Sequence, residues 1–283
     1  DEEEIKRELE AYMSQRNAQQ VEDFEGYSPA QMHQLLYDPF GSRSVLKLNR
    51  LYNEEYSQVP ILLLVKHLMQ VVQCAKELKL TAKGYLPSKV VVDIYNQKFI
   101  KEPMIDSGAQ KLRKETDSMT INLARHIAEI GGLIKMRKNR LSITKKGISY
   151  LEDDNTLLRQ IWQTFGREFN WGYYDGYEDD KVGQLGFAFS LVLIGIYGDQ
   201  KRDYGFYAEK YFRAYPQLKE RFNGNEYTSQ TEQAHRCYLL RTISRFLDYF
   251  GVLTENTESL LSEKRELQKS ALFDKMISIT KPL

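Results

Sequence analysis

The chain has 283 residues, with 40 Lys and Arg against 39 Asp and Glu, so its formal net charge is +1. This balance excludes a uniformly charged tail-like protein, and a mean hydropathy of −0.54 excludes a polytopic membrane protein. Hydrophobic residues make up 42% of the sequence, enough for a substantial core, and the length favours two domains with an N-terminal extension.

The first 57 residues are expected to form a helical extension. Residues 1–26 carry nine acidic and three basic side chains. Four apolar residues recur there at helical spacing: Ile5, Leu9, Tyr12 and Met13. We expect an amphipathic helix that is either solvated or docked on a basic surface. Ser28-Pro29 then predicts the N-cap and first residue of a second helix, which ends before the turn at Asp38-Pro39.

Residues 58–153 are expected to form the first domain, in which three helices precede a β-hairpin. The helices are predicted over 61–78, 89–96 and 118–130, the last capped by Thr116 or Asp117 and stopped by Gly131-Gly132. Short apolar strands follow at 133–136 and 141–144, joined by a basic turn over 137–140. The acidic run 152–154 predicts the end of this domain.

Residues 154–283 are expected to form a second, mostly helical domain. Helices are predicted over 157–169, 185–197, 204–215 and 231–250, before a weak hairpin and a final helix. The stretch 185–197 is the most apolar part of the chain, but it is too short to span the roughly 30 Å of hydrocarbon in a bilayer. We therefore expect a buried core helix and no membrane association.

Two helix ends along the chain share one pattern. Residues 123–134 (LARHIAEIGGLI) align with residues 243–254 (ISRFLDYFGVLT), so that Arg125 falls on Arg245 and Gly131 on Gly251. The shared features are an inward apolar stripe, a Gly stop and a return into an extended segment, which is typical of an internal repeat. Chance similarity between two amphipathic helices is the alternative.

The segment Ser118–Tyr150 resembles the winged-helix superfamily. It combines a helix, a Gly stop, a short strand, a turn and the string LSITKKG (residues 141–147), and the similar string LKLTAKG occurs at residues 78–84. The chain also resembles uncharacterised bacterial proteins that carry LTAKGYLP after an apolar helix. The resemblance implies a mainly α fold with two winged-helix-like α+β units, small β-hairpins and extra helices, as in helix-turn-helix DNA-binding proteins.

Positive charge is concentrated in residues 61–150, which hold 17 Lys or Arg against seven Asp or Glu. Duplex DNA attracts such a surface by counterion release. The resemblance implies that the helix before the wing reads bases and that the basic wing contacts phosphates. The expected DNA-binding residues are Asn122, Arg125, His126, Lys135, Arg137, Lys138, Arg140, Lys145 and Lys146. On the helix, Asn122, Arg125, His126 and Glu129 are predicted to face outward.

Two alternatives to DNA reading stay open. The basic hairpin can be solvated surface that protects a strand edge, and the scaffold then serves as a protein-interaction or structural module. The alignment of Arg125 with Arg245 also indicates a structural ion pair, and Glu129 would repel phosphate. The sequence locates no oligomerisation surface and assigns no role to residues 155–235.

No catalytic, cofactor or metal signature is present, so we expect a protein that is not an enzyme and binds no cofactor. The acidic residues at 175–180 lack the spacing of a calcium loop and are expected to be a solvated loop. The four histidines are scattered. Cys74 and Cys237 are far apart, which predicts two reduced, mostly buried thiols in a cytoplasmic protein.

Overall fold

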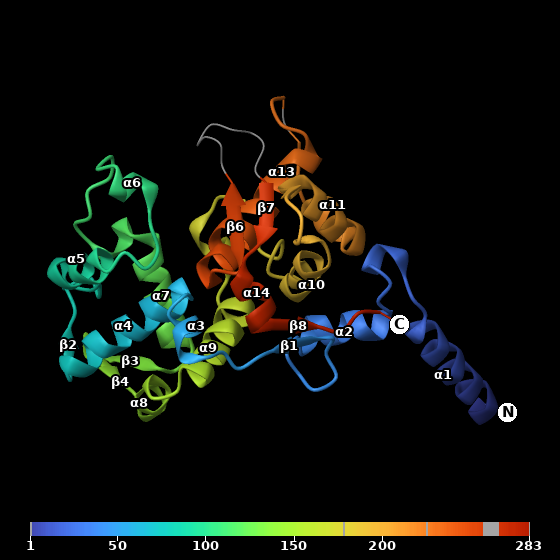
Figure 1. Cartoon of the computed structure of the whole chain (residues 1–283), viewed down its shortest axis with the longest axis horizontal. Coiled ribbons are helices and arrows are strands. Elements are labelled where there is room, and N and C mark those ends of the chain that lie inside the picture. Colours follow the sequence, from blue (N-terminus) through green and yellow to red (C-terminus); the bar gives the residue numbers. More distant parts are fainter. Residues whose placement is uncertain (1, 178, 225, 257–265, 283) are drawn as a thin grey trace. The chain divides into compact units, whose positions relative to one another are not determined.

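The computed structural model describes residues 2–282 except 178, 225 and 257–265. The chain is mainly helical, with 58% helix and small antiparallel sheets of two or three strands (Figure 1). The expected mainly α fold with small β-hairpins is therefore confirmed. Within these ranges, no helix combines the length and apolar character needed to cross a bilayer.

The chain divides into two compact units, each built from separated segments. Unit 1 comprises residues 1–49, 177–243 and 253–283, and unit 2 comprises residues 50–176 and 244–252. This division differs from the three consecutive domains 1–57, 58–153 and 154–283 expected above. One reason is that β1 (Leu46–Leu48) pairs antiparallel with β8 (Ile277–Ile279), so that segments from opposite ends of the chain close the same unit.

Unit 2 combines helices with a three-stranded antiparallel sheet of order β2-β4-β3. Its α-helices and strands are α3 (Asn53–Tyr56), α4 (Pro60–Cys74), β2 (Leu78–Lys79), α5 (Ser88–Asn96), α6 (Pro103–Asp106), α7 (Met119–Ile130), β3 (Ile134–Arg137), β4 (Arg140–Ile143), α8 (Lys145–Leu151) and α9 (Asp154–Gln163). Helix α4 forms much of the core, because Leu64, Leu68 and Val72 share one face and are all buried.

The N-cap of α7 lies one residue after Asp117 and two after Thr116, the two predicted caps. Ser118 is the N-cap, and its hydroxyl accepts a hydrogen bond from the Ile121 amide at 3.3 Å. Asp117 instead closes the preceding turn, where its carboxylate accepts from the Arg113 and Lys114 amides at 2.9 and 3.0 Å. The prediction of a cap at Thr116 or Asp117 was therefore wrong, although the helix itself was correctly placed.

Unit 1 has a second three-stranded sheet, of order β5-β7-β6. Besides β1 and β8, its α-helices and strands are α1 (Glu2–Ala18), α2 (Pro29–Tyr37), α10 (Phe187–Tyr197), β5 (Arg202–Asp203), α11 (Tyr204–Ala214), α12 (Pro216–Lys219), α13 (Gln230–Tyr238), β6 (Leu253–Asn256), β7 (Glu266–Lys269) and α14 (Ala271–Met276). Helix α10 is buried over most of its length, as its apolar sequence predicts. The long helix expected over 231–250 is regular only to Tyr238 and continues as a π-helix, Leu239–Leu247, and a 3-10 turn.

The acidic N-terminal helix is solvated. No residue of α1 is buried, and the four apolar side chains of its stripe are each at least half exposed. Of the two states expected from sequence, the structure places α1 in the first. By contrast, Ser28 and Pro29 begin α2 as predicted, and Ser28 forms a reciprocal capping box with Gln31.

The helices and strands around each of the two three-stranded sheets follow one another in the same order along the chain. A helix, a short strand, three helices, a hairpin and a closing helix follow one another as α4-β2-α5-α6-α7-β3-β4-α8, and again as α10-β5-α11-α12-α13-β6-β7-α14. In each sheet the second hairpin strand is central. The left-handed glycine before the hairpin is Gly251 in one case and Gly132 in the other, so the predicted pairing of Gly131 with Gly251 is shifted by one residue.

Candidate nucleic-acid interface

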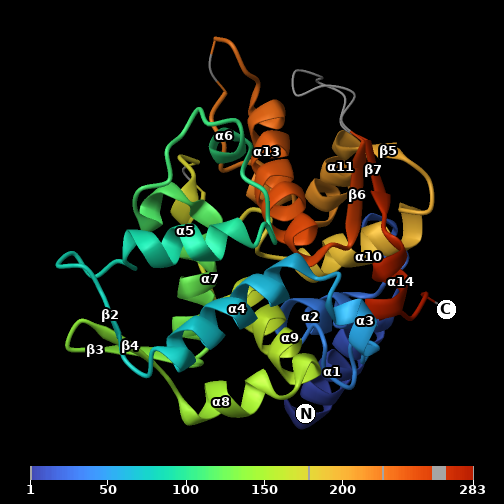
Figure 2. The same cartoon turned by 60° about the vertical axis from the view of Figure 1, so that its left-hand side comes forward.

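In unit 2, the β2-β4-β3 sheet packs against α4 and α7 (Figure 2). One face of this sheet is apolar and the other is basic. Side chains alternate between the faces of a strand, so the buried Ile134 and Leu141 define the inner face, which α4 and α7 cover. The outer face then carries four cations, which we call the basic face: Lys79, Lys135, Arg137 and Arg140. All four are exposed, and the three strands themselves place no acid on this face.

The strand register aligns three of these cations in one row across the sheet. Lys79 of β2 pairs with Arg140 of β4, and Arg140 pairs with Arg137 of β3. Like charges directly opposite each other on neighbouring strands destabilise a sheet. Arg140 lies 3.4 Å from the Glu77 carboxylate, and both side chains are at least half exposed. Within the described part of the chain, Lys135, Arg137 and Lys138 form no ion pair, so their charge is available to a ligand.

The hairpin turn is held against the loop that follows β2. Lys138 and Asn139 both have positive φ, 49° and 59°, which is the geometry of a two-residue type I′ turn. The side-chain amide of Asn139 donates to the backbone carbonyls of Leu80 and Thr81 at 3.3 and 2.9 Å. The backbone amide of Leu80 donates to the backbone carbonyl of Asn139 at 3.0 Å. The β3-β4 hairpin therefore has a fixed position beside the loop that carries the exposed Lys83.

The string Thr144-Lys145-Lys146-Gly147 begins helix α8 rather than extending the strand. Thr144 is the N-cap and accepts from the Gly147 amide at 2.9 Å. A Cβ at Gly147 would lie 2.1 Å from the Leu133 carbonyl, so only glycine fits this close approach. Lys145 is exposed, whereas Lys146 donates to the Gly131 carbonyl at 2.8 Å and thereby satisfies the end of α7.

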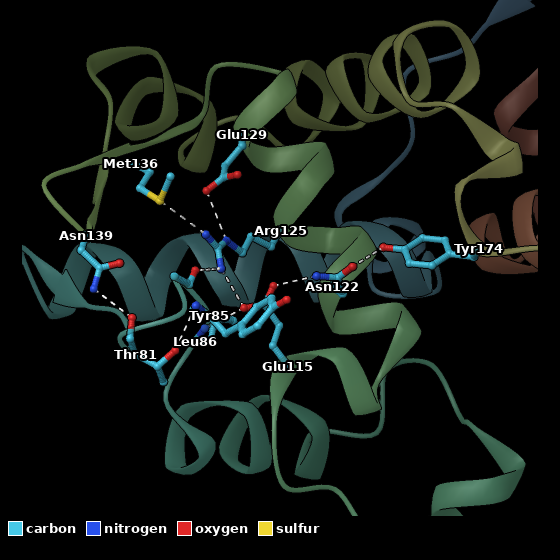
Figure 3. Close-up of polar contacts among 11 residues, drawn as sticks. Thr81, Tyr85, Leu86, Glu115, Asn122, Arg125, Glu129, Met136, Asn139 and Tyr174 are labelled. Carbon is cyan, nitrogen blue, oxygen red and sulfur yellow. Dashed lines mark hydrogen bonds and ion pairs between the residues drawn. The ribbon is translucent and has the colours of Figure 1, made fainter.

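Helix α7 does not present its polar side chains outward. Asn122 and Arg125 are buried, and His126 and Glu129 are partly buried, so the predicted outward face was wrong. Arg125 donates to Glu115 at 2.7 Å, to Glu129 at 3.2 Å and to the Gly84 carbonyl at 2.9 Å (Figure 3). The alternative, a structural ion pair at Arg125, is confirmed.

Glu115 is the centre of this buried network. One carboxylate oxygen accepts from the Leu86 amide and from Arg125 at 2.6 and 2.7 Å, and the other accepts from Asn122 at 2.8 Å. Asn122 in turn accepts from the Tyr174 hydroxyl at 2.6 Å. A buried carboxylate needs such donors, and these bonds hold the side chains of Asn122 and Arg125 inside unit 2, away from any base edge. Sequence reasoning missed Glu115, whose only signal was the aligned arginine.

His126 is packed among aromatic rings rather than free to contact DNA. Its ring centroid lies 5.5 Å from that of Tyr173 and 6.1 Å from that of Phe169. Burial lowers the pKa of the imidazole below its ordinary value, with Glu129 and Glu115 acting in the opposite direction. The side chain is therefore neutral at neutral pH and adds no positive charge to the surface.

Two of the acidic residues at 175–180, Asp175 and Asp179, are buried and so do not belong to the solvated loop that was expected, whereas Asp180 is exposed and Glu178 lies outside the described residues. Asp175 is almost fully buried and lies 3.7 Å from Arg245, the arginine that aligns with Arg125 in the repeat. Asp179 is buried as well and accepts from the Lys181 and Val182 amides and from Arg221. In the described ranges, no group of His, Cys, Asp or Glu side chains is placed to hold a metal ion. Of the two cysteines, Cys237 is buried but Cys74 is exposed.

No family profile, curated protein or solved structure matches this chain.

Proposed function

We propose that this protein binds double-stranded DNA without catalysing a reaction, and that it does so through the basic face of unit 2. The observation that carries the proposal is the cross-strand row Lys79–Arg140–Arg137, with Lys135 beside it. A row of like charges costs sheet stability, and a polyanion removes that cost on binding. DNA presents one negative charge per roughly 1.7 Å of helix axis, which suits a flat, one-signed surface.

The buried state of α7 supports a particular kind of DNA binding. The wing, rather than the helix, then makes the contacts, and those contacts are to phosphates. Arg125 supports the hairpin through Met136 and the neighbouring loop through the Gly84 carbonyl, while Lys138 and Lys145 extend the phosphate track at its two ends. Binding of this kind is independent of sequence. The element order around the sheet is consistent with the winged-helix resemblance, which remains part of this proposal.

The decisive experiment is fluorescence anisotropy with a random-sequence duplex. The wild type should bind in the micromolar range, and log K should fall with log salt with a slope of about −5, because the six cations of the track release roughly 0.9 counterion each. The variant Arg137→Glu/Lys138→Glu/Arg140→Glu should not bind measurably.

A matched control separates the wing from net charge. Lys111→Glu/Arg113→Glu/Lys114→Glu makes the same charge change at three exposed residues of the same unit, in the loop before α7. It should keep more than half of the binding free energy. Equal losses in the two variants would mean that no local interface exists. No binding by the wild type even at low salt would favour the protein-interaction module instead.

A further inference from the structure

The sheet of unit 1 carries acids where the sheet of unit 2 carries cations. In unit 2, Lys79 pairs with Arg140, one residue along from the pair Leu78–Leu141. In unit 1, Asp203 pairs with Glu266, one residue along from the pair Arg202–Leu267. Leu141 and Leu267 are both buried, so Lys79 corresponds to Asp203 and Arg140 to Glu266.

The outer face of the unit 1 sheet is accordingly acidic and polar. Its described side chains, which we call the acidic face, are Asp203, Thr254, Glu266 and Gln268. Asp203 and Glu266 are exposed, and neither forms an ion pair within the described ranges. Their carboxylates stand directly opposite each other on neighbouring strands, an arrangement that lowers sheet stability just as the basic row does. Each face therefore gains from an oppositely charged partner.

We propose that the acidic face of one molecule docks on the basic face of a second copy of this chain. Both faces are built on the same strand order and register, so their charged rows have the same spacing between strands, about 4.8 Å. Arg137 and Arg140 can each present two parallel donors to a carboxylate. Two basic faces or two acidic faces repel, which makes the contact head-to-tail rather than symmetric.

Charge complementarity favours this occupant over the other acidic element of unit 1. Helix α1 is acidic, but its exposed stripe is apolar, with Ile5 and Leu9 more than half exposed. The basic face holds no apolar side chain to cover that stripe. The acidic face has no such stripe to bury. The contact is made of exposed ion pairs, so it is weak and is screened at high salt.

Sedimentation velocity over a concentration series, without nucleic acid, tests the contact. At low salt the weight-average mass of the wild type should rise with concentration, and it should return to that of the monomer at about 0.5 M salt, where the screening length is only a few ångströms. The assay contains no DNA, so its result does not depend on the proposed function.

Charge reversal identifies the faces. The variant Asp203→Asn/Glu266→Lys removes the acidic face, and Asn keeps the N-cap that Asp203 provides for α11. The variant Arg137→Glu/Arg140→Glu reverses the basic face. Each variant alone should self-associate about tenfold more weakly than the wild type, whereas an equal mixture of the two should associate again. Circular dichroism checks that both variants are folded.

Three outcomes overturn the proposal. The wild type can remain monomeric at low salt and the highest concentration reached. Self-association can persist unchanged in both variants, which places the contact elsewhere on the molecule. The mixture can also fail to recover association, which means that the two faces do not meet.

Discussion

Arg125 is the side chain whose loss we expect to lower the stability of the fold most. Its guanidinium and the Glu115 carboxylate are 7% and 1% exposed and lie 2.7 Å apart. Arg125→Ala leaves the carboxylate buried without its counterion, which should lower the free energy of unfolding by about 3–5 kcal/mol. Urea unfolding followed by circular dichroism measures this change.

The matched control for Arg125 is another arginine of the same unit. Arg140 and its partner Glu77 are half exposed or more, so Arg140→Ala should change the free energy of unfolding by no more than about 1 kcal/mol. A loss in Arg125→Ala as small as in this control would contradict the structural role of Arg125. It would also reopen base reading by α7.

Two partly buried histidines should make stability depend on pH. Burial lowers the pKa of His126 in unit 2 and of His235 in unit 1. The folded protein then binds the proton less tightly than the unfolded chain, whose histidine pKa is about 6.5. Stability from these groups is complete above that value and is lost as pH falls toward the lowered pKa.

A histidine substitution isolates this effect. In His126→Gln, the free energy of unfolding should fall less between about pH 7 and pH 5 than in the wild type, because the group that resists protonation is gone. His33 is exposed on α2, so His33→Gln is the control and should leave the slope unchanged. If both variants keep the wild-type slope, His126 does not contribute to it.

In the β3-β4 hairpin, the stability of the fold and the proposed DNA binding should conflict. Arg137 faces Arg140 across the hairpin. Arg137→Glu converts a like-charge pair into an opposite pair, which should raise the free energy of unfolding by about 0.2–1 kcal/mol. The same change should weaken DNA binding severalfold. Thermal unfolding and anisotropy on one preparation test both. A variant that loses stability, or that keeps its full DNA affinity, would contradict this account of the basic row.

The elements themselves were largely predictable because their ends carry local signals. Ser28-Pro29 and the Gly131-Gly132 stop place α2 and α7 correctly. The partners of Asn122 and Arg125 were not predictable, because Glu115 belongs to a separate 3-10 turn and the Leu86 amide comes from the loop before α5. Polar residues on a helix are expected to face solvent unless a buried polar partner from another segment is known. The pairing of β2 with β4 is equally non-local, and only it aligns Lys79 with Arg140.

The near-zero net charge of the whole chain results from opposite local excesses of charge. Residues 61–150 have a net charge of +10, which leaves about −9 on the rest of the chain. Residues 1–26 hold −6 of this. Helix α1, which buries no side chain, has five acidic and three basic side chains and so holds −2. Helix α1 therefore adds no side chain to the core, and its charged side chains lie at the surface of the protein.

Two N-terminal truncations test which part of this acidic segment stabilises the fold. Deletion of residues 1–18 should leave the free energy of unfolding within about 0.5 kcal/mol of the wild type, because surface changes away from the core have small effects. The cut must stop there, because Glu25 forms a 2.7 Å ion pair with Lys210 and accepts from the Tyr197 hydroxyl. Deletion to residue 26 should therefore destabilise the protein by more than 1 kcal/mol, through the loss of a partly buried charge partner. Chemical unfolding of the two truncations measures the difference, and equal stabilities would show that Glu25 contributes nothing to the fold.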